Sequence, residues 1–260
     1  MTLFEPVEPA APPGPLVRVR MTVAYLGTSF HGFAPNPGVR TVGGVLGEAL
    51  ARVLRAPVEL TCAGRTDAGV HAFGQVVSFD APARGLDLVA LARTLNKLCG
   101  PHIAVRELAE APGFDARFSA RSRVYRYELL CSSTPDPFLA ATAWRVPPPL
   151  DLAALRLGCD PLIGQHDFAA FCRRPPGDAS TVRTVLDAAW RDLGGGRYRF
   201  QIEAAAFCHQ MVRSVVGTLV EVGSGRKRAG EVASILRSRD RRYAGQLAPP
   251  HGLCLWEVRY

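Results

Sequence analysis

Apolar positions in the first 110 residues recur at two different periods, and each period predicts one kind of element. Alternation over Leu16–Leu26 predicts a half-buried strand. A stripe at i, i+3, i+4 and i+7 predicts a helix over Val42–Leu54, with Thr41 as its N-cap. Similar patterns predict strands at Val58–Cys62, Gly74–Phe79 and Ile103–Leu108, and a helix at Leu86–Leu98. This order is the β-α-β-β-α-β of a ferredoxin-like domain.

The rest of the chain repeats that order without repeating its residues. Strands are expected at Arg123–Leu130, Thr184–Leu193, Arg197–Ala206 and Cys254–Val258, and helices at Leu152–Ile163, Met211–Val222 and Ala229–Arg237. We therefore predict an α+β fold with an N-terminal ferredoxin-like half over residues 16–112 and a C-terminal half over residues 113–260. The proline-rich start, residues 1–15, is expected to be a disordered lead.

Composition narrows the class of protein. The chain has 260 residues, of which 48% are hydrophobic and 21% charged, as in ordinary folded domains. Its 31 basic and 23 acidic residues leave a net charge of +8, which favours a polyanionic partner. No apolar run approaches the roughly 18 to 20 residues of a membrane span. None of the seven cysteines forms a C-x-x-C pair, so we expect reduced thiols, no metal site and a soluble cytoplasmic protein.

One carboxylate stands in an unusual setting. Residues 63–75 read AGRTDAGVHAFGQ, in which Asp67 lies among small residues between Arg65 and His71. A turn or helix N-cap explains such an Asp, because its carboxylate accepts backbone N–H bonds. The alternative is a nucleophilic carboxylate, which needs cationic neighbours such as Arg65 and His71 to keep its pKa low. Spacing alone favours the turn.

A second candidate lies in an apolar helix start. Arg213 follows Met211 and Val212 and precedes a Ser-Val-Val run. A guanidinium in such surroundings either extends to solvent or pairs with an anion. Asp67 is a candidate for that anion.

Aromatic and basic residues alternate over Phe114–Leu130, FDARFSARSRVYRYELL. Tyr125 and Tyr127 lie on one face of the predicted strand, and arginines crowd the approach to it: Arg117, Arg121, Arg123 and Arg126. Tyrosines at this spacing are usually core. The density of arginine favours the other interpretation, a nucleic-acid surface in which guanidinium groups meet phosphates and rings meet unstacked bases.

Together these stretches resemble a known family. The blocks GRTDAGVHA (64–72), FDARFSARSRVYRY (114–127), HDFAAF (166–171), CHQMVRSVVGTL (208–219) and APPHGLCL (248–255) resemble, in order, those of the TruA-type tRNA pseudouridine synthases. The resemblance runs from about Val17 to Tyr260. It implies two ferredoxin-like halves whose antiparallel sheets join. It also implies a homodimer whose basic surface binds the tRNA anticodon arm, where uridines at positions 38–40 become pseudouridine.

The same resemblance assigns roles to individual residues. Asp67 takes the place of the catalytic aspartate, and Arg213 that of the arginine paired with it. Tyr125 matches the tyrosine that lies against the target base, and Leu253 matches the pocket leucine. Arg65 matches the arginine that holds RNA and assists base flipping.

The early block departs from the family pattern. Phe33 and Ala34 follow Gly32 where the family has a Gly-Trp motif, and Gly43 and Gly47 replace the usual Gln and Glu. These departures concern RNA contacts of that segment and leave the chemistry unchanged. Isomerisation of uridine has no redox change and transfers no external group, so no cofactor or metal is expected. Asp67 can attack the ribose C1′ or the base C6, or remove a sugar proton.

Other functions remain as alternatives. A non-catalytic RNA-binding module would also be basic and rich in aromatic residues. A pseudouridine synthase acting on a different RNA would share every motif named above. A glycosidase-like hydrolase would use two carboxylates flanking the scissile bond, whereas only Asp67 is suitably placed.

Overall fold

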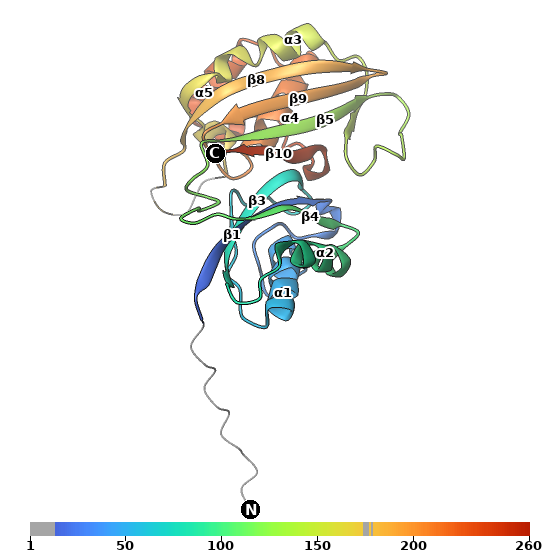
Figure 1. Ribbon diagram of the computed structural model, residues 1–260. Helices are drawn as coiled ribbons and strands as arrows, with labels where there is room; N and C mark the ends of the chain where they lie inside the picture. Colours follow the sequence, from blue (N-terminus) through green and yellow to red (C-terminus); the bar gives the residue numbers. More distant parts are fainter. Residues whose placement is uncertain (1–13, 174–176, 178) are drawn as a thin grey trace, which may run out of the picture.

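A computed structural model of the protein describes residues 14–173, 177 and 179–260. The predicted disordered lead therefore lies, apart from its last two residues, outside the described part of the chain. The described strands form one ten-stranded sheet in the order β4-β1-β3-β10-β5-β9-β8-β7, with β2 paired to β3 and β6 to β5. Helices α1 and α2 pack with the first strands, and α3, α4 and α5 cover the others (Figure 1).

The first half contains β1 (Leu16–Tyr25), α1 (Val42–Leu54), β2 (Thr61–Cys62), β3 (His71–Pro82), α2 (Leu88–Cys99) and β4 (Ile103–Glu110). Both helices begin at side-chain caps. The Thr41 hydroxyl accepts from the Gly44 N–H at 3.1 Å, and the Asp87 carboxylate accepts from the backbone N–H groups at the start of α2. The apolar stripes of these helices and the alternate residues of β1 are buried together in the core.

The second half contains β5 (Ser122–Cys131), β6 (Trp144–Val146), α3 (Leu152–Leu157), β7 (Gly164–Asp167), β8 (Val182–Gly194), β9 (Arg197–Ala204), α4 (Met211–Gly223), α5 (Glu231–Ser238) and β10 (Leu253–Arg259). With the short β6 and β7 and the additional helix α5 set aside, it follows the same β-α-β-β-α-β order as the first half. The first half has strand order β4-β1-β3-β2, and the second has the equivalent order β10-β5-β9-β8.

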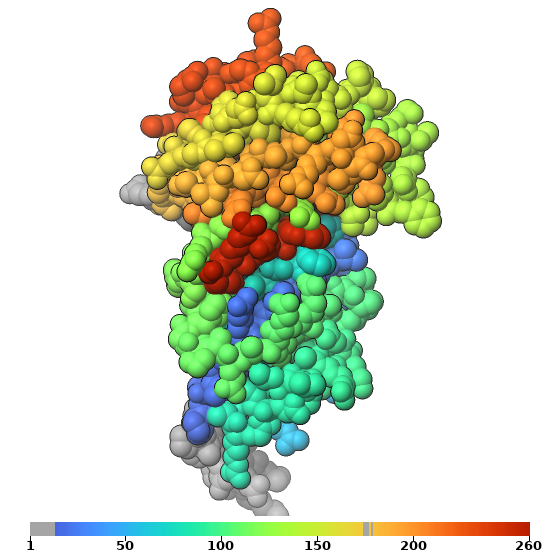
Figure 2. Space-filling model, turned by 45° about the horizontal axis from the view of Figure 1, so that its top comes forward, coloured from blue at the N-terminus to red at the C-terminus, as the bar shows by residue number. Residues whose placement is uncertain are grey.

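The two halves join through an edge that β2 leaves open. β2 pairs with β3 only opposite Val77 and Ser78. Farther along the same edge, β10 pairs in parallel with His71 and Ala72 of β3, while its other edge pairs antiparallel with β5. The predicted joining of the sheets is confirmed, and the joint itself is a short parallel ladder. Figure 2 shows the C-terminal segment, in dark red, crossing between the two halves.

Several predicted boundaries are wrong. The strand predicted over Val58–Cys62 is reduced to its last two residues, and β3 begins at His71, three residues before its predicted start. The helix predicted over Leu152–Ile163 ends at Leu157, because Gly158 and Pro161 interrupt it and a 3-10 turn covers Asp160–Leu162. Within the described residues, no helix combines the length and the apolar character needed to cross a membrane.

Candidate active site

The segment between β2 and β3 lies where the two halves meet, and several bonds hold it in place. The Phe33 N–H donates to the Thr66 carbonyl at 3.1 Å, and the Thr66 hydroxyl lies 2.7 Å from the buried Tyr25 hydroxyl. Gln75 donates to the Gly64 carbonyl at 2.7 Å. Gly69 has φ +78°, and a Cβ there would lie 2.9 Å from Pro250, so a larger residue would be strained and crowded. Asp67 is therefore carried on a fixed loop.

Asp67 and Arg213 form an ion pair across the junction. The Arg213 guanidinium lies 3.3 Å from Asp67 Oδ2 and also donates through Nε to the Ala248 carbonyl at 2.8 Å. The Arg213 side chain is 12% exposed and the Asp67 side chain 26% exposed. The pairing that the sequence suggested is present, and it satisfies the guanidinium that α4 carries into its apolar surroundings.

His209 is a second neighbour of the carboxylate, which the sequence analysis did not identify. Its Nε2 lies 3.3 Å from Asp67 Oδ1, and its side chain is 48% exposed. It lies just before Gln210, which has φ +64° at the start of α4. The only signal in the sequence was its position in the same CHQMVR block as Arg213. The two oxygens of Asp67 thus face two different basic groups.

Tyr125 lies close enough to Asp67 to feel its charge, and Leu253 lies on the neighbouring strand β10. Leu253 lies opposite Tyr127 and Leu255 opposite Tyr125, so these side chains share one face of the sheet. Burial raises the pKa of Tyr125, and the negative charge of Asp67 raises this pKa further. The phenol is therefore neutral near pH 7. Tyr127 is fully buried, with its hydroxyl donating to the Pro249 carbonyl at 2.8 Å, and it belongs to the core.

The arginines near β5 divide into two groups. Arg65, Arg117 and Arg121 are exposed. Arg123 and Arg126 are half-buried and are bonded within the protein. Arg123 donates to backbone carbonyls, and Arg126 lies 3.8 Å from the centre of the Trp256 ring and donates to Gln201. The donors of Arg123 are taken up by backbone carbonyls, which leaves this guanidinium to hold the protein together, and for Arg126 the role in the approach to RNA stays a prediction.

His71 is a fixed structural residue that does not serve as a cation beside Asp67. Its Nδ1 accepts from the Gly27 N–H at 2.8 Å, so Nε2 carries the proton and donates to the carbonyls of Ala141 and His251 at 3.0 and 2.9 Å. Burial lowers the pKa of His71. The neutral imidazole ties the first half of the molecule to two segments of the second.

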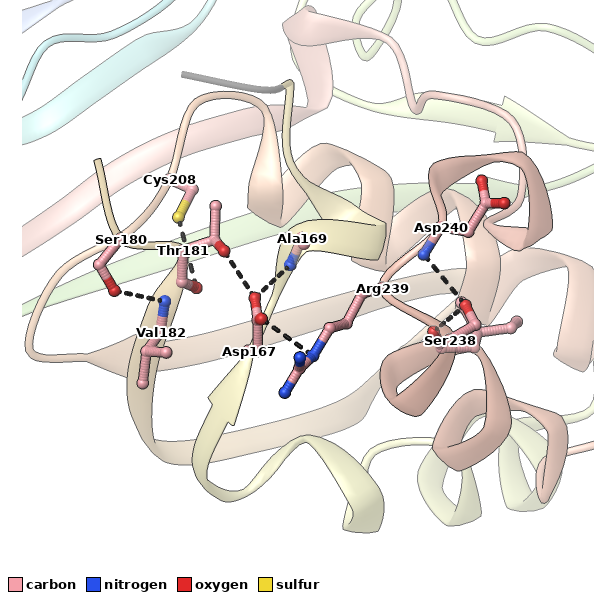
Figure 3. Close-up of polar contacts among 10 residues, drawn as sticks. Asp167, Ala169, Ser180, Thr181, Val182, Cys208, Ser238, Arg239 and Asp240 are labelled. Carbon is pink, nitrogen blue, oxygen red and sulfur yellow. Dashed lines mark hydrogen bonds and ion pairs between the residues drawn. The ribbon is translucent and has the colours of Figure 1, made fainter. Parts of the chain in front are cut away.

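The HDFAAF block is bonded to the segment that carries His209 through Thr181. Figure 3 shows Asp167 accepting from the Thr181 hydroxyl at 2.6 Å and the Ala169 N–H at 3.1 Å, and pairing with Arg239 at 3.0 Å. The thiol of Cys208, which directly precedes His209, donates to the Thr181 carbonyl at 3.8 Å. The network therefore joins the ends of β7 and α5 to the segment that carries His209.

Of the early departures from the family pattern, Phe33 and Gly43 are buried, and Ala34 and Gly47 are half-buried. Phe33 is buried, and its ring centre lies 6.3 Å from that of Tyr25. The Gly43 N–H donates to the Phe33 carbonyl at 2.8 Å, and a Cβ on Gly43 would lie 2.6 Å from that oxygen. Phe33 and Gly43 are thus in direct contact, whereas a Cβ on Gly47 would have no neighbour within 4 Å.

A family model and several curated relatives that match this chain all carry the name tRNA pseudouridine synthase. The family described as tRNA pseudouridine synthase matches residues 21–119 and 159–260. Proteins named tRNA pseudouridine synthase A are similar to most of this chain. That of Frankia casuarinae is 47% identical over 94% of this chain and 90% of its own length. That of Myxococcus xanthus is 42% identical over 94% and 92%, and that of Bacillus licheniformis 37% identical over 94% and 99%.

Among solved structures, one titled "Crystal Structure of a Cbf5-Nop10-Gar1 Complex" aligns with 78% of this chain and 45% of that chain. The identity is 14% and the TM-score 0.33, too low a likeness to carry an argument.

Proposed function

The chain belongs to the tRNA pseudouridine synthase family, an isomerase family that converts uridine to pseudouridine in tRNA, and we propose that it acts at positions 38–40 of the anticodon stem-loop with Asp67 as nucleophile. One observation carries the assignment of Asp67. It is the carboxylate on a fixed loop at the junction of the halves, paired with the guanidinium of Arg213. Retaining such a pair in a largely buried setting calls for a functional reason, because an isolated buried ion pair adds little stability.

The reaction needs one carboxylate with free access to the nucleotide. It breaks the bond from C1′ to N1, turns the base over and forms a bond from C1′ to C5; C5 loses its proton and N1 takes one up. Asp67 is partly exposed, so it can reach a ribose or a base in the site. As a nucleophile it can attack C1′ or C6 from this position; the alternative is that it acts as a base and removes a sugar proton.

Buried side chains near Asp67 are assigned to the target base, and an exposed arginine is assigned to the surrounding RNA. Tyr125 and Leu253 form the apolar wall against which the target base lies, since both are nearly buried and share a sheet face. The target must leave its stack, which costs a few kcal/mol. Arg65 is exposed two residues before Asp67, where its guanidinium can hold RNA and occupy the space of the flipped base.

The partner, the oligomeric state and the location of the enzyme are part of the proposed function. Its partner is the tRNA anticodon arm, in keeping with the net charge of +8. The family resemblance supports a cytoplasmic homodimer, and all seven cysteines are free thiols, which fits a reducing compartment. Sedimentation of the purified protein measures the dimer directly: a monomer at micromolar concentration would contradict it.

Mapping of the modified nucleotides tests the substrate assignment. Unmodified tRNA transcripts are incubated with the protein, and pseudouridines are located by chemical derivatisation and primer extension. Modification at positions 38–40 is expected. Modification only elsewhere would show a paralogue that acts on a different site. Binding of tRNA without any modification would support the non-catalytic RNA-binding module instead.

A further inference from the structure

An aromatic ring and a guanidinium project together from the connection between β4 and β5. Phe118 is 80% exposed, and the guanidinium carbon of Arg117 lies 5.4 Å from the centre of its ring. Single exposed apolar residues are common and need no explanation by themselves. What needs an explanation is the turn that carries this ring, because its own polar groups fix it.

The turn is closed by its own polar groups. The Asp115 carboxylate accepts from the backbone N–H groups of Arg117 and Phe118, both at 2.8 Å. The Ser119 N–H donates to the Asp115 carbonyl at 3.0 Å, and the Asp115 N–H donates to the Ser119 hydroxyl at 3.1 Å. The backbone under the ring is thus held without any packing of the ring itself.

One guanidinium ties this turn to the loop that carries Asp67. Arg123 donates to the Arg117 carbonyl at 2.8 Å and to the Ala63 carbonyl at 2.9 Å. It also donates to the Ala205 carbonyl of the second half at 2.7 Å. Arg123 therefore fixes the position of the turn relative to the Asp67 loop and to the end of β9.

We propose that Phe118 and Arg117 form a stacking site for an unpaired nucleobase of the bound tRNA, next to the nucleotide at Asp67. The proposal rests on the proposed tRNA substrate. Ring faces bind unstacked bases regardless of their identity, and a neighbouring guanidinium adds attraction to the base or its phosphate. The fixed turn keeps this platform at a set distance from the flipped uridine.

The surroundings of the ring favour a nucleotide over an apolar protein surface. Its chain neighbours Arg117 and Ser119 are exposed, and so is Arg121. An apolar docking surface would instead present contiguous apolar side chains. The cationic rim suits a ligand that carries one negative charge per nucleotide.

Substitutions of the full chain test the site through tRNA affinity. Phe118→Ala should raise the Kd for a tRNA transcript about 10-fold, the effect of losing one base–aromatic stack. Phe118→Tyr should remain within about 2-fold of wild type, because a phenol ring stacks equally well. Arg117→Ala should lower the slope of log Kd against log salt by about one. Phe138→Ala is the matched control, since Phe138 is 93% exposed on the connection between β5 and β6 and should leave the Kd unchanged.

A second readout reports on stacking itself. In Phe118→Trp the added indole fluorescence, after subtraction of the signal from the three native tryptophans, should be quenched when tRNA binds. Unchanged emission together with a wild-type Kd for Phe118→Ala would overturn the proposal. A change in sedimentation for Phe118→Ala would overturn it too, because the ring would then be a subunit contact. If Phe118 governs the Kd but wild-type protein makes no pseudouridine, the stacking site stands and the proposed function fails.

Discussion

Asp67 has two basic neighbours that differ in burial. Arg213 is nearly enclosed and is bound a second time by the Ala248 carbonyl, whereas about half of the His209 side chain is in solvent. Exposed ion pairs contribute about 1 kcal/mol or less, because water screens them and the side chains lose freedom. Arg213 is therefore the neighbour that fixes the orientation of the carboxylate.

Substitution of the two neighbours should separate their contributions. Arg213→Lys should lower kcat/KM about 100-fold or more, because a single ammonium cannot bond Ala248 and reach Asp67 with the geometry of the planar fork. His209→Ala should lower kcat/KM less than about 10-fold. Steady-state kinetics on a tRNA transcript measures both. Equal losses in the two variants would contradict this account.

Single residues show what the sequence could and could not reveal. The Asp67–Arg213 pair was predictable because a guanidinium among apolar residues needs an anion, and the chain offered one suitable carboxylate. His209 gave no comparable signal, since a histidine at an exposed helix start is compatible with many roles. The sequence could not reveal the role of Arg123, because an arginine on a strand gives the same pattern whether its guanidinium binds phosphates or, as here, backbone carbonyls.

At the scale of elements, α4 positions the site by unusually close packing. A Cβ on Gly217 would lie 1.7 Å from the Gln246 carbonyl oxygen. Two residues farther on, Ala248 exchanges bonds with Arg213 at 3.2 and 2.8 Å. The absence of a side chain at Gly217 thus lets the segment that orients Arg213 lie against the helix.

Two glycine-to-alanine substitutions in helices should act in opposite directions. Gly217→Ala should lower the free energy of unfolding by about 1 to 3 kcal/mol, because α4 and the Gln246 segment must separate. Gly47→Ala in α1 meets no neighbour within 4 Å and should raise the free energy of unfolding by about 0.5 to 1 kcal/mol. Urea unfolding measures both, and a shift of the same sign in the two variants would be inconsistent with this packing.

The sequence predicted long elements better than short ones. The stripe of α1, the long apolar run of α4 and the alternation of β1 gave nearly correct bounds, because each pattern extends over ten or more residues. β6 and β7 have three and four residues, too few to show a period. The parallel pairing of β10 with β3 was beyond the reach of periodicity, which says nothing about which strands are neighbours.

The whole molecule depends on a narrow joint between its halves. We propose residues 16–112 and 113–260 as the two units, joined by the β3–β10 ladder. His71 lies at this ladder and bonds to Gly27 in the first half and to Ala141 and His251 in the second. The same joint carries the Asp67 loop, so its integrity bears on both stability and activity.

The stability of the joint should depend on pH through His71. Burial lowers the pKa of His71 below its ordinary value of about 6.5, so the unfolded chain takes up this proton first as the pH falls. Its contribution to stability is complete above about pH 6.5 and is lost below it. The difference in unfolding free energy between wild type and His71→Gln should therefore narrow from pH 7.5 to pH 5.5. A difference that stays constant across this range would refute the assignment of a neutral, buried imidazole.

Release of tritium from uridine C5 tests the central claim, that Asp67 performs the isomerisation, most directly. Wild-type protein incubated with tRNA tritiated at uridine C5 should release tritium to water, because C5 loses its proton when the base rejoins the ribose. Asp67→Ala should release none while binding tRNA within a few-fold of the wild-type Kd. Continued release by Asp67→Ala at a rate near that of wild type would contradict the account.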